Sequence, residues 1–166
     1  MRKEDKEMDV RNLFLFFVLS AVVVVSDQVV KYFVRHTLTE GRSVNVISHF
    51  VSFTYVQNRG AAFGFFQNSR LFIIVVGILA AVFILAELKL FCANGVVSLG
   101  SALLFGGIVG NLIDRIFLGF VTDFIDFHFW PVFNIADACI DIGLVILIIY
   151  FIHHGEDIKI GFSRAH

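Results

Sequence analysis

The chain has 166 residues, of which 58% are hydrophobic, 16% are charged and one is proline, and its formal net charge is −1. A soluble domain of this length carries more charge, so the composition predicts a membrane protein. The near-zero net charge excludes the basic surface that nucleic-acid binding requires. The two cysteines, Cys92 and Cys139, have no metal-binding spacing and do not look placed for a disulfide.

The first predicted membrane span is Leu13 to Val34, which at 1.5 Å per residue can cross a hydrocarbon core of about 30 Å. Within it, Asp27 and Lys31 are four residues apart, so they share a helix face and can pair. We expect Asp27 to point into the bundle, whereas Lys31 could instead snorkel to the interface while neutralising it. A cleavable signal peptide ending at Ser26 is the alternative, but the apolar run continues beyond that residue.

A segment of about residues 41–66 is expected to form a small β structure outside the membrane. Its β-branched and aromatic residues predict strands at about Val44–Ile47 and Val51–Gln57. The turn Asn58-Arg-Gly-Ala-Ala-Phe-Gly64 follows them. Glycines 60 and 64 permit close backbone approach, which suits a loop that touches a substrate or the bilayer surface. A plain connecting turn explains the same residues.

Three further spans are predicted at about residues 71–90, 96–118 and 135–152, so both termini lie on one side of the membrane. The excess of basic residues on that side predicts cytoplasmic termini. The basic residues counted there, against those on the other side, are Arg2, Lys3, Lys6, Arg11, Lys89, Lys159 and Arg164, against Arg35, Arg42, Arg59 and Arg70. No internal repeat is apparent, which argues against an inverted-repeat transporter.

The third span combines small and polar residues. Gly106 and Gly110 have the GxxxG spacing that lets helices approach closely. Asn111, Asp114 and Arg115 follow on one helix face near the outer end. This group could be a structural ion pair or a polar anchor facing a substrate.

Two carboxylates near the outer ends of the last two spans form the candidate catalytic pair. Asp123 is flanked by apolar residues, and desolvation should raise its pKa. Asp137 lies three residues after Asn134, a potential N-cap, so it could simply be a capping-box acid, and the helix dipole favours its ionised form. Carboxyl groups in such different environments suit an aspartic protease, with Asp137 ionised and Asp123 protonated.

Five stretches in register with the four spans are Asp27-Gln-Val-Val-Lys31, Asn58-Arg-Gly-Ala-Ala-Phe-Gly64, Gly107-Ile-Val-Gly-Asn-Leu-Ile-Asp-Arg115, Gly119-Phe-Val-Thr-Asp-Phe124 and Phe133-Asn-Ile-Ala-Asp137. They resemble the lipoprotein signal peptidases (signal peptidase II), aspartic endopeptidases of the bacterial cytoplasmic membrane. The resemblance implies one membrane-embedded domain over residues 1–166, with four transmembrane helices, a small extracytoplasmic β-cradle and the active site at the outer face.

The resemblance also implies the chemistry. The substrates would be prolipoproteins cut immediately before a diacylglyceryl-modified cysteine, by a monomer surrounded by membrane lipids and sensitive to globomycin. Asp123 and Asp137 match the catalytic dyad; no metal or other cofactor is expected, because the sequence has no ligand cluster. Eight positions match residues that line or support the site: Asp27, Lys31, Asn58, Gly60, Asn111, Arg115, Asn134 and Ala136.

Two positions depart from the family pattern. Ala138 stands where a small polar residue is common, so a supporting hydrogen bond would be missing. Asp141 stands one turn after Asp137, where an uncharged residue is usual, and two ionised carboxylates there would repel each other. We expect Asp141 to be protonated or paired with Lys31 or Arg115.

Two non-enzymatic alternatives stay open at this point. A proton- or cation-conducting protein could use intramembrane acids as a relay, the candidates being Asp27, Asp114, Asp137 and Asp141. A structural subunit could use its polar groups for helix packing. Neither gives a reason for the extramembrane turn motif, and ion flux insensitive to globomycin would favour conduction.

Overall fold

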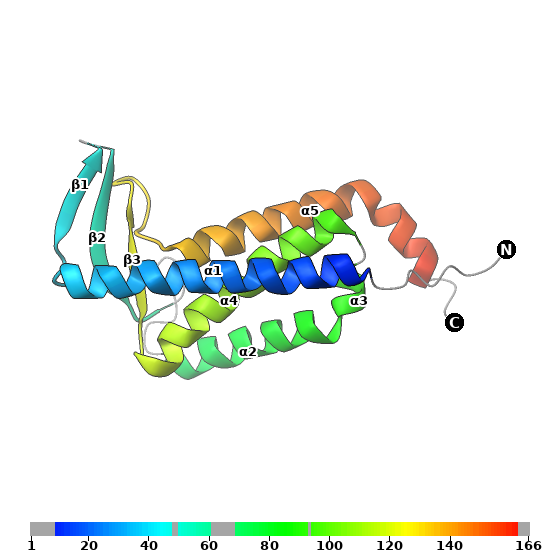
Figure 1. The fold of residues 1–166 in the computed structure, drawn as a ribbon, viewed down its shortest axis with the longest axis horizontal. Helices are drawn as coiled ribbons and strands as arrows, with labels where there is room; N and C mark the ends of the chain where they lie inside the picture. The colour runs from blue at the N-terminus through cyan, green and yellow to red at the C-terminus, as the bar shows by residue number, and fades with distance from the viewer. Residues whose placement is uncertain (1–8, 48–49, 61–68, 93, 163–166) are drawn as a thin grey trace.

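Four long helices lie along one another, and a small sheet covers one end of the bundle (Figure 1). The computed structural model describes residues 9–47, 50–60, 69–92 and 94–162, with side chains up to His154. The helices are α1 (Val10–Thr37), α2 (Arg70–Ala86), α3 (Leu88–Phe91), α4 (Gly95–Phe117) and α5 (Ile135–Phe162). The strands are β1 (Ser43–Ile47), β2 (Val51–Asn58) and β3 (Val121–Asp126). This arrangement confirms the predicted fold class.

Among the described residues, three helices are long and apolar enough to cross a membrane, namely α1, α4 and residues Ile135–His154 of α5. α1 continues without a break past Ser26, where the alternative signal peptide would end. The predicted second span, 71–90, is shorter than expected, because α2 ends at Ala86 and the separate helix α3 follows Glu87. At 1.5 Å per residue, the 17 residues of α2 extend about 26 Å.

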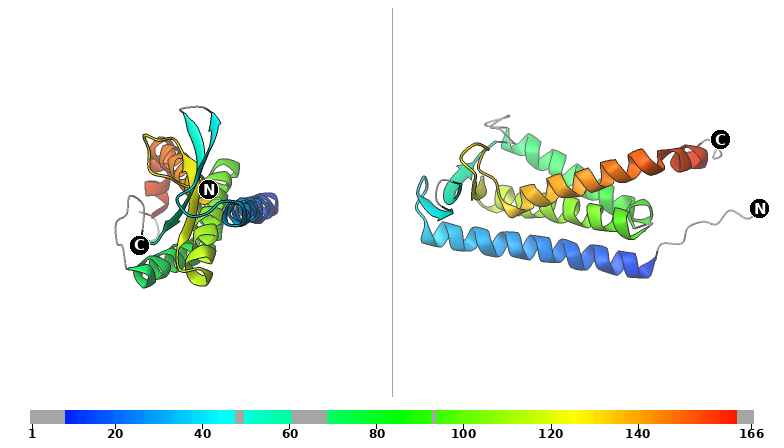
Figure 2. Two further views of the ribbon diagram at one scale, coloured as in Figure 1. Left: turned by 90° about the vertical axis from the view of Figure 1, so that its left-hand side faces the viewer. Right: turned by 90° about the horizontal axis from the view of Figure 1, so that it is seen from above.

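α4 is the central helix of the bundle. It packs against α1, α2 and α5, and the view from above in Figure 2 shows it between α1 and α5. Glycines allow this closeness: a Cβ atom at Gly106 would lie 2.8 Å from Cβ of Val23 on α1, and one at Gly110 would lie 3.3 Å from Cβ of Ala136 on α5. The packing role predicted for the GxxxG pair is therefore confirmed.

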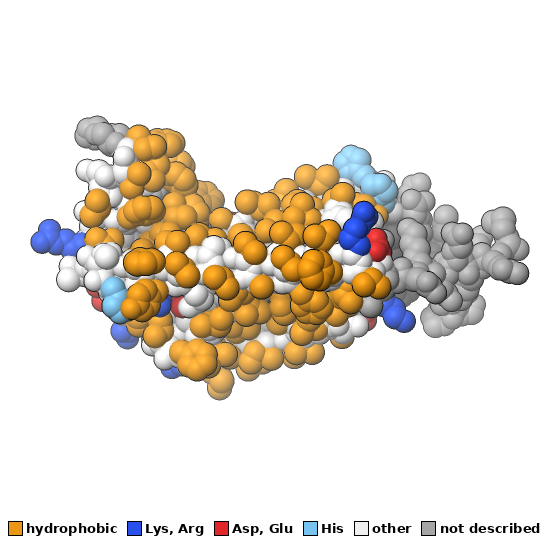
Figure 3. All heavy atoms as spheres, viewed as in Figure 1, with side chains coloured by type: hydrophobic (Ala, Val, Ile, Leu, Met, Phe, Trp, Pro, Cys, Tyr) orange, Lys and Arg blue, Asp and Glu red, His pale blue; other side chains and the backbone are white. Residues whose placement is uncertain are grey.

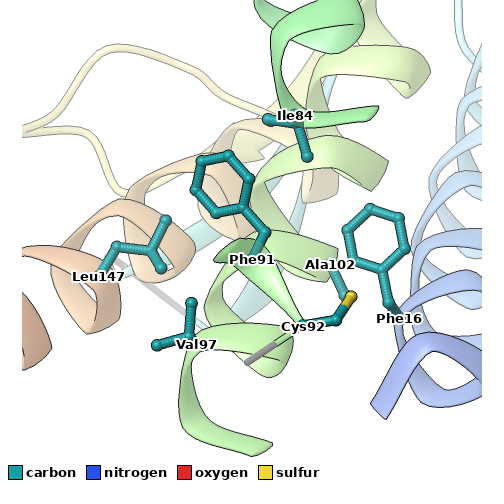
Figure 4. Close-up of a cluster of buried hydrophobic side chains, with 7 residues drawn as sticks. All are labelled: Phe16, Ile84, Phe91, Cys92, Val97, Ala102 and Leu147. Atoms are coloured by element: carbon teal, nitrogen blue, oxygen red, sulfur yellow. The ribbon is translucent and has the colours of Figure 1, made fainter. Parts of the chain in front are cut away.

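The main hydrophobic core lies toward the end of the bundle away from the sheet, and Figure 4 shows its buried side chains. All five helices contribute side chains to it, so it fixes the helix ends relative to one another. Its buried members are Phe16, Ile84, Phe91, Cys92, Val97, Ala102 and Leu147. The outward faces of the helices are also apolar (Figure 3), as expected where lipid surrounds a bundle.

The sheet is antiparallel in the order β1-β2-β3, and β1 and β2 match the predicted strands closely. β3 was not predicted, since its alternation looked irregular. The structure gives the reason: Val121 through Phe124 are all buried, so neither face of this part of the strand is exposed to solvent and the sequence lacks a regular alternation. β2 pairs with β3 in a register that sets Val56 opposite Asp123, which brings the second strand to the candidate dyad.

The contact between α4 and α5 predicts a strong effect of one added methyl group. A Cβ atom at Gly143 would lie 2.5 Å from the backbone oxygen of Gly100, which cannot move alone. Gly143→Ala should therefore lower the free energy of unfolding by about 1–3 kcal/mol. Gly77→Ala is the matched control, because its Cβ would meet only the end of the Leu112 side chain, at 2.8 Å. Equal thermal stabilities of the two variants in detergent would contradict this packing.

Candidate active site

A cavity of about 950 Å³ lies where the sheet meets the bundle. Both predicted catalytic residues line it, Asp123 from β3 and Asp137 from the first turn of α5. Four more of the predicted site residues line it as well: Asn58, Gly60, Asn111 and Arg115. Within the described part of the chain, no three His, Cys, Asp or Glu side chains are grouped so as to hold a metal ion.

Asp123 is 1% exposed and its carboxylate accepts hydrogen bonds from two asparagines. Nδ2 of Asn58, at the end of β2, donates to Oδ2 over 2.9 Å, and Nδ2 of Asn134 donates to Oδ1 over 2.7 Å. The sheet register and the loop before α5 thus both determine where this carboxylate lies.

Asp137 and Asn134 form the predicted capping box at the start of α5. The backbone N–H of Asp137 donates to Oδ1 of Asn134 over 2.9 Å, and the N–H of Asn134 donates to Oδ2 of Asp137 over 3.2 Å. Nδ2 of Asn111 on α4 donates to the other oxygen, Oδ1, over 2.8 Å. A hydrogen bond of 3.2 Å from Nδ2 of Asn134 to Oδ1 of Asn111 completes a bridge between the two carboxylates.

Behind the cavity, Lys31 is fully buried and contacts two acids. Its Nζ lies 2.8 Å from Oδ2 of Asp27 and 3.4 Å from Oδ2 of Asp114, and it donates to Oδ1 of Asn111 over 3.0 Å. The predicted pair with Asp27 is confirmed, and the alternative that Lys31 snorkels to the interface is wrong. Oδ1 of Asp27 in turn accepts the backbone N–H of Ala136 over 3.0 Å.

The sequence analysis identified Asp114 as a polar group of the third span but did not predict that it belongs to the site. It is 1% exposed, and its Oδ2 accepts the backbone N–H of Thr122 over 2.9 Å. Its Oδ1 accepts from Nε2 of Gln28 over 3.1 Å and lies 3.7 Å from Nη1 of Arg35. The i,i+3 spacing from Asn111 was the signal for it, but β3, which supplies its partner, was not predicted.

Arg115 lines the cavity without a carboxylate partner among the described residues. Its Nη2 donates to the carbonyl oxygen of Gly60 over 3.2 Å. The backbone N–H of Gly60 donates to Oδ1 of Asn58 over 3.0 Å. Arg115 thus supports the start of the turn that follows β2, and Gly64 at the other end of that turn lies outside the described residues. Arg70, which sequence reasoning missed, donates from Nε to the carbonyl oxygen of Arg115 over 2.9 Å.

Asp141 lies exposed on the cavity wall. It makes no ion pair within the described ranges, so of the two expected states the pairing with Lys31 or Arg115 is wrong, and protonation of Asp141 stays a prediction. Nζ of Lys31 is already taken by Asp27 and Asp114, and Arg115 is turned toward backbone carbonyls.

The two candidate carboxylates occupy an environment that favours a proton on Asp123. Burial, and next the nearby charge of Asp137, raise the pKa of Asp123 to about 7, against the smaller opposing effect of its hydrogen bonds from Asn58 and Asn134. This agrees with the direction predicted from its apolar neighbours. Near neutral pH Asp123 can therefore retain a proton.

The raised pKa of Asp123 predicts that stability depends on pH. An unperturbed Asp has a pKa of 3.8, so from there to about 7 the folded protein retains a proton that the unfolded chain has released. The free energy of unfolding therefore falls by up to about 4 kcal/mol as the pH rises through this window, and it levels off above it. Asp123→Asn should flatten this decline in unfolding measurements in detergent. Parallel stability curves for the variant and the wild type would contradict the raised pKa.

Comparison with known proteins identifies the family. The family model described as signal peptidase (SPase) II matches residues 19–153. The lipoprotein signal peptidase of Caldanaerobacter subterraneus subsp. tengcongensis is 45% identical over 78% of this chain and 90% of its own. That of Halothermothrix orenii is 40% identical over 82% and 94%. A solved bacterial membrane enzyme superposes with a TM-score of 0.82 at 33% identity, covering 86% of this chain and 90% of its own. The chain belongs to the signal peptidase II family.

Proposed function

We propose that the protein is an aspartic endopeptidase that removes the signal peptide from diacylglyceryl-modified prolipoproteins, cutting immediately before the lipid-modified cysteine. One observation carries the proposal: Asp123 and Asp137 line the same cavity and are bridged by Asn111 and Asn134. The named relatives, which are lipoprotein signal peptidases, support the choice of substrate.

The two carboxyl groups divide the chemistry of peptide hydrolysis between them. Asp137, which accepts hydrogen bonds from Asn111 and Asn134 at a helix N-terminus, stays ionised and takes a proton from the attacking water. Asp123 donates its proton to the carbonyl oxygen of the scissile bond as the tetrahedral intermediate forms. The proton on Asp137 then passes to the leaving amine while the intermediate returns a proton to Asp123, so the pair is restored. The two groups titrate together as one pair.

The walls of the cavity suit a substrate that arrives from the bilayer. Away from the two carboxylates, α4 presents Ile108 and Leu112, flanked by Ile73 on α2 and Ile140 on α5. Such an apolar surface can take a signal segment or acyl chains, while polar groups at the sheet end fix the cleavage site. Asn58 and Arg115 are among the polar groups that line the cavity.

We further propose that this single domain acts as a monomer in the bacterial inner membrane, with cytoplasmic termini and the site at the outer face. The start of α1 and the end of α5 lie at the end of the bundle opposite the sheet (Figure 1), which supports the proposal that both termini lie on the same side of the membrane. The proposal that this side is cytoplasmic rests on the excess of basic residues.

Cleavage of a diacylglyceryl-modified prolipoprotein peptide by the purified protein in detergent tests the proposal. The wild type should cut before the modified cysteine, and globomycin should block the reaction. Asp123→Asn and Asp137→Asn should each lower kcat by a factor of about 10²–10⁴, because each removes a proton-transferring group. Mass spectrometry of the products identifies the bond that is cut.

Two results would count against this assignment. If one of the two variants folds and retains substantial activity, the pair is misassigned, and Asp141 or Asp114 becomes the next candidate. If a well-folded wild type does not cut at all, conduction by the intramembrane acids becomes the better reading.

Asp141→Asn should leave cleavage within about twofold of the wild type, because Asp141 is exposed on the cavity wall and holds no ion pair in the described structure. The same peptide assay, run beside Asp137→Asn, measures this. A loss as deep as that of Asp137→Asn would mean that the proposed pair is incomplete.

A further inference from the structure

Two buried acids, Asp27 on α1 and Asp114 on α4, make matching contacts with the backbone. Oδ1 of Asp27 accepts the backbone N–H of Ala136 over 3.0 Å, and Ala136 immediately precedes Asp137. Oδ2 of Asp114 accepts the backbone N–H of Thr122 over 2.9 Å, and Thr122 immediately precedes Asp123. Each acid thus holds the chain one residue before a member of the proposed dyad.

One lysine joins the two acids. Nζ of Lys31 lies 2.8 Å from Asp27 and 3.4 Å from Asp114, and all three side chains are buried. Arg35 supplies a second positive charge, 3.7 Å from Asp114, and also donates to Oγ1 of Thr122 over 3.0 Å. The charges of two acidic and two basic side chains therefore balance. Charge-assisted hydrogen bonds between buried groups are short and directional.

None of these side chains lines the cavity that holds Asp123 and Asp137. Asp27, Lys31 and Asp114 are absent from the cavity lining. In a strand, successive side chains point to opposite faces, so the Thr122 side chain lies on the Arg35 side and the Asp123 side chain lies toward the cavity. The acids therefore act on the backbone from behind the site.

We propose that Asp27, Lys31 and Asp114 form one positioning unit, defined here as the backbone anchor, which sets the separation of Asp123 from Asp137. Asp114 holds β3, Asp27 holds the start of α5, and Lys31 fixes the two acids relative to each other. Lys31 also acts on the site indirectly, because it donates to Oδ1 of Asn111, whose Nδ2 donates to Asp137. This inference rests on the proposed peptidase function.

Gly110 supports the inference from a different direction. A Cβ atom there would lie 2.9 Å from Oδ2 of Asp27 and 3.3 Å from Cβ of Ala136. A glycine is therefore needed at the point where α4 passes the Asp27 contact. Gly110→Ala offers a way to displace the backbone anchor without removing any charge.

The test is kinetic and uses the full chain in detergent with the peptide substrate described above. Asp114→Ala and Asp27→Ala should each lower kcat about 100-fold, because a misplacement of about 1 Å costs that much, while KM stays within about twofold. Asp114→Asn and Asp27→Asn keep an oxygen that can accept the backbone N–H, so they should recover part of kcat. Combining both alanine substitutions should cost less than the product of the single effects, because the two acids act through one lysine.

Asn12→Ala is the matched control for a loss of stability alone. Asn12 is 4% exposed on α1 and donates to the carbonyl oxygen of Cys92 over 3.3 Å, at the far end of the bundle. It should lower thermal stability but leave kcat unchanged. If an alanine variant of either acid fails to fold, kcat and KM are measured for the asparagine variants and for Gly110→Ala instead. Their kcat should still fall below that of Asn12→Ala, while KM stays within about twofold of the wild type.

The outcomes separate this inference from the proposed function. Suppose that the wild type cuts, but the anchor variants keep wild-type kcat, change only in KM, or lose no more kcat than Asn12→Ala does. The proposed backbone anchor is then wrong, and the peptidase assignment stands. If the folded wild type does not cut, the peptidase assignment itself fails, and the positioning role fails with it.

Discussion

The structure depends on a lysine ammonium buried among carboxylates inside an apolar bundle. Removing a charge from water is costly, and breaking a buried pair typically costs about 3–5 kcal/mol, so the partners of Lys31 cannot shift independently. Since Asp27 and Lys31 are on α1 and Asp114 is on α4, their contacts fix these two helices in register. The start of β3 and the start of α5 follow from the same contacts, because each acid also bonds a backbone N–H there.

The proposed chemistry depends on a second set of contacts, around Asp123 and Asp137. Amide side chains, which donate without carrying charge, surround both Asp123 and Asp137 and hold them in one cavity. Their environments still differ, since one lies on a buried strand and the other at a helix N-terminus. A pair that shares one proton near neutral pH can activate water from its own carboxyl groups.

Sequence reasoning predicted the four long helices and two of the strands, because each had a local signal. It also named six residues that line the cavity, four of them from the family resemblance. The Asn134–Asp137 capping box and the Asp27–Lys31 pair depend on spacings of three and four residues, which a helix converts directly into contacts. β3 lacked such a signal because both of its faces are buried. The roles of Asp114 and Arg35 therefore could not be predicted, since both act on Thr122 of this strand. Thr122 is eight residues from Asp114 and 87 residues from Arg35 along the chain. The pairing expected for Asp141 was wrong because Lys31 had nearer partners on α1 and α4.

The dependence of kcat/KM on pH for peptide cleavage tests the central claim most directly, because it reports the essential acid and base of the free enzyme. A carboxyl pair that must carry one proton predicts a bell-shaped profile whose upper limb falls near pH 7, set by the raised pKa of Asp123. Activity that stays level or rises well above that pH would contradict a protonated Asp123, and with it the proposed division of roles between Asp123 and Asp137.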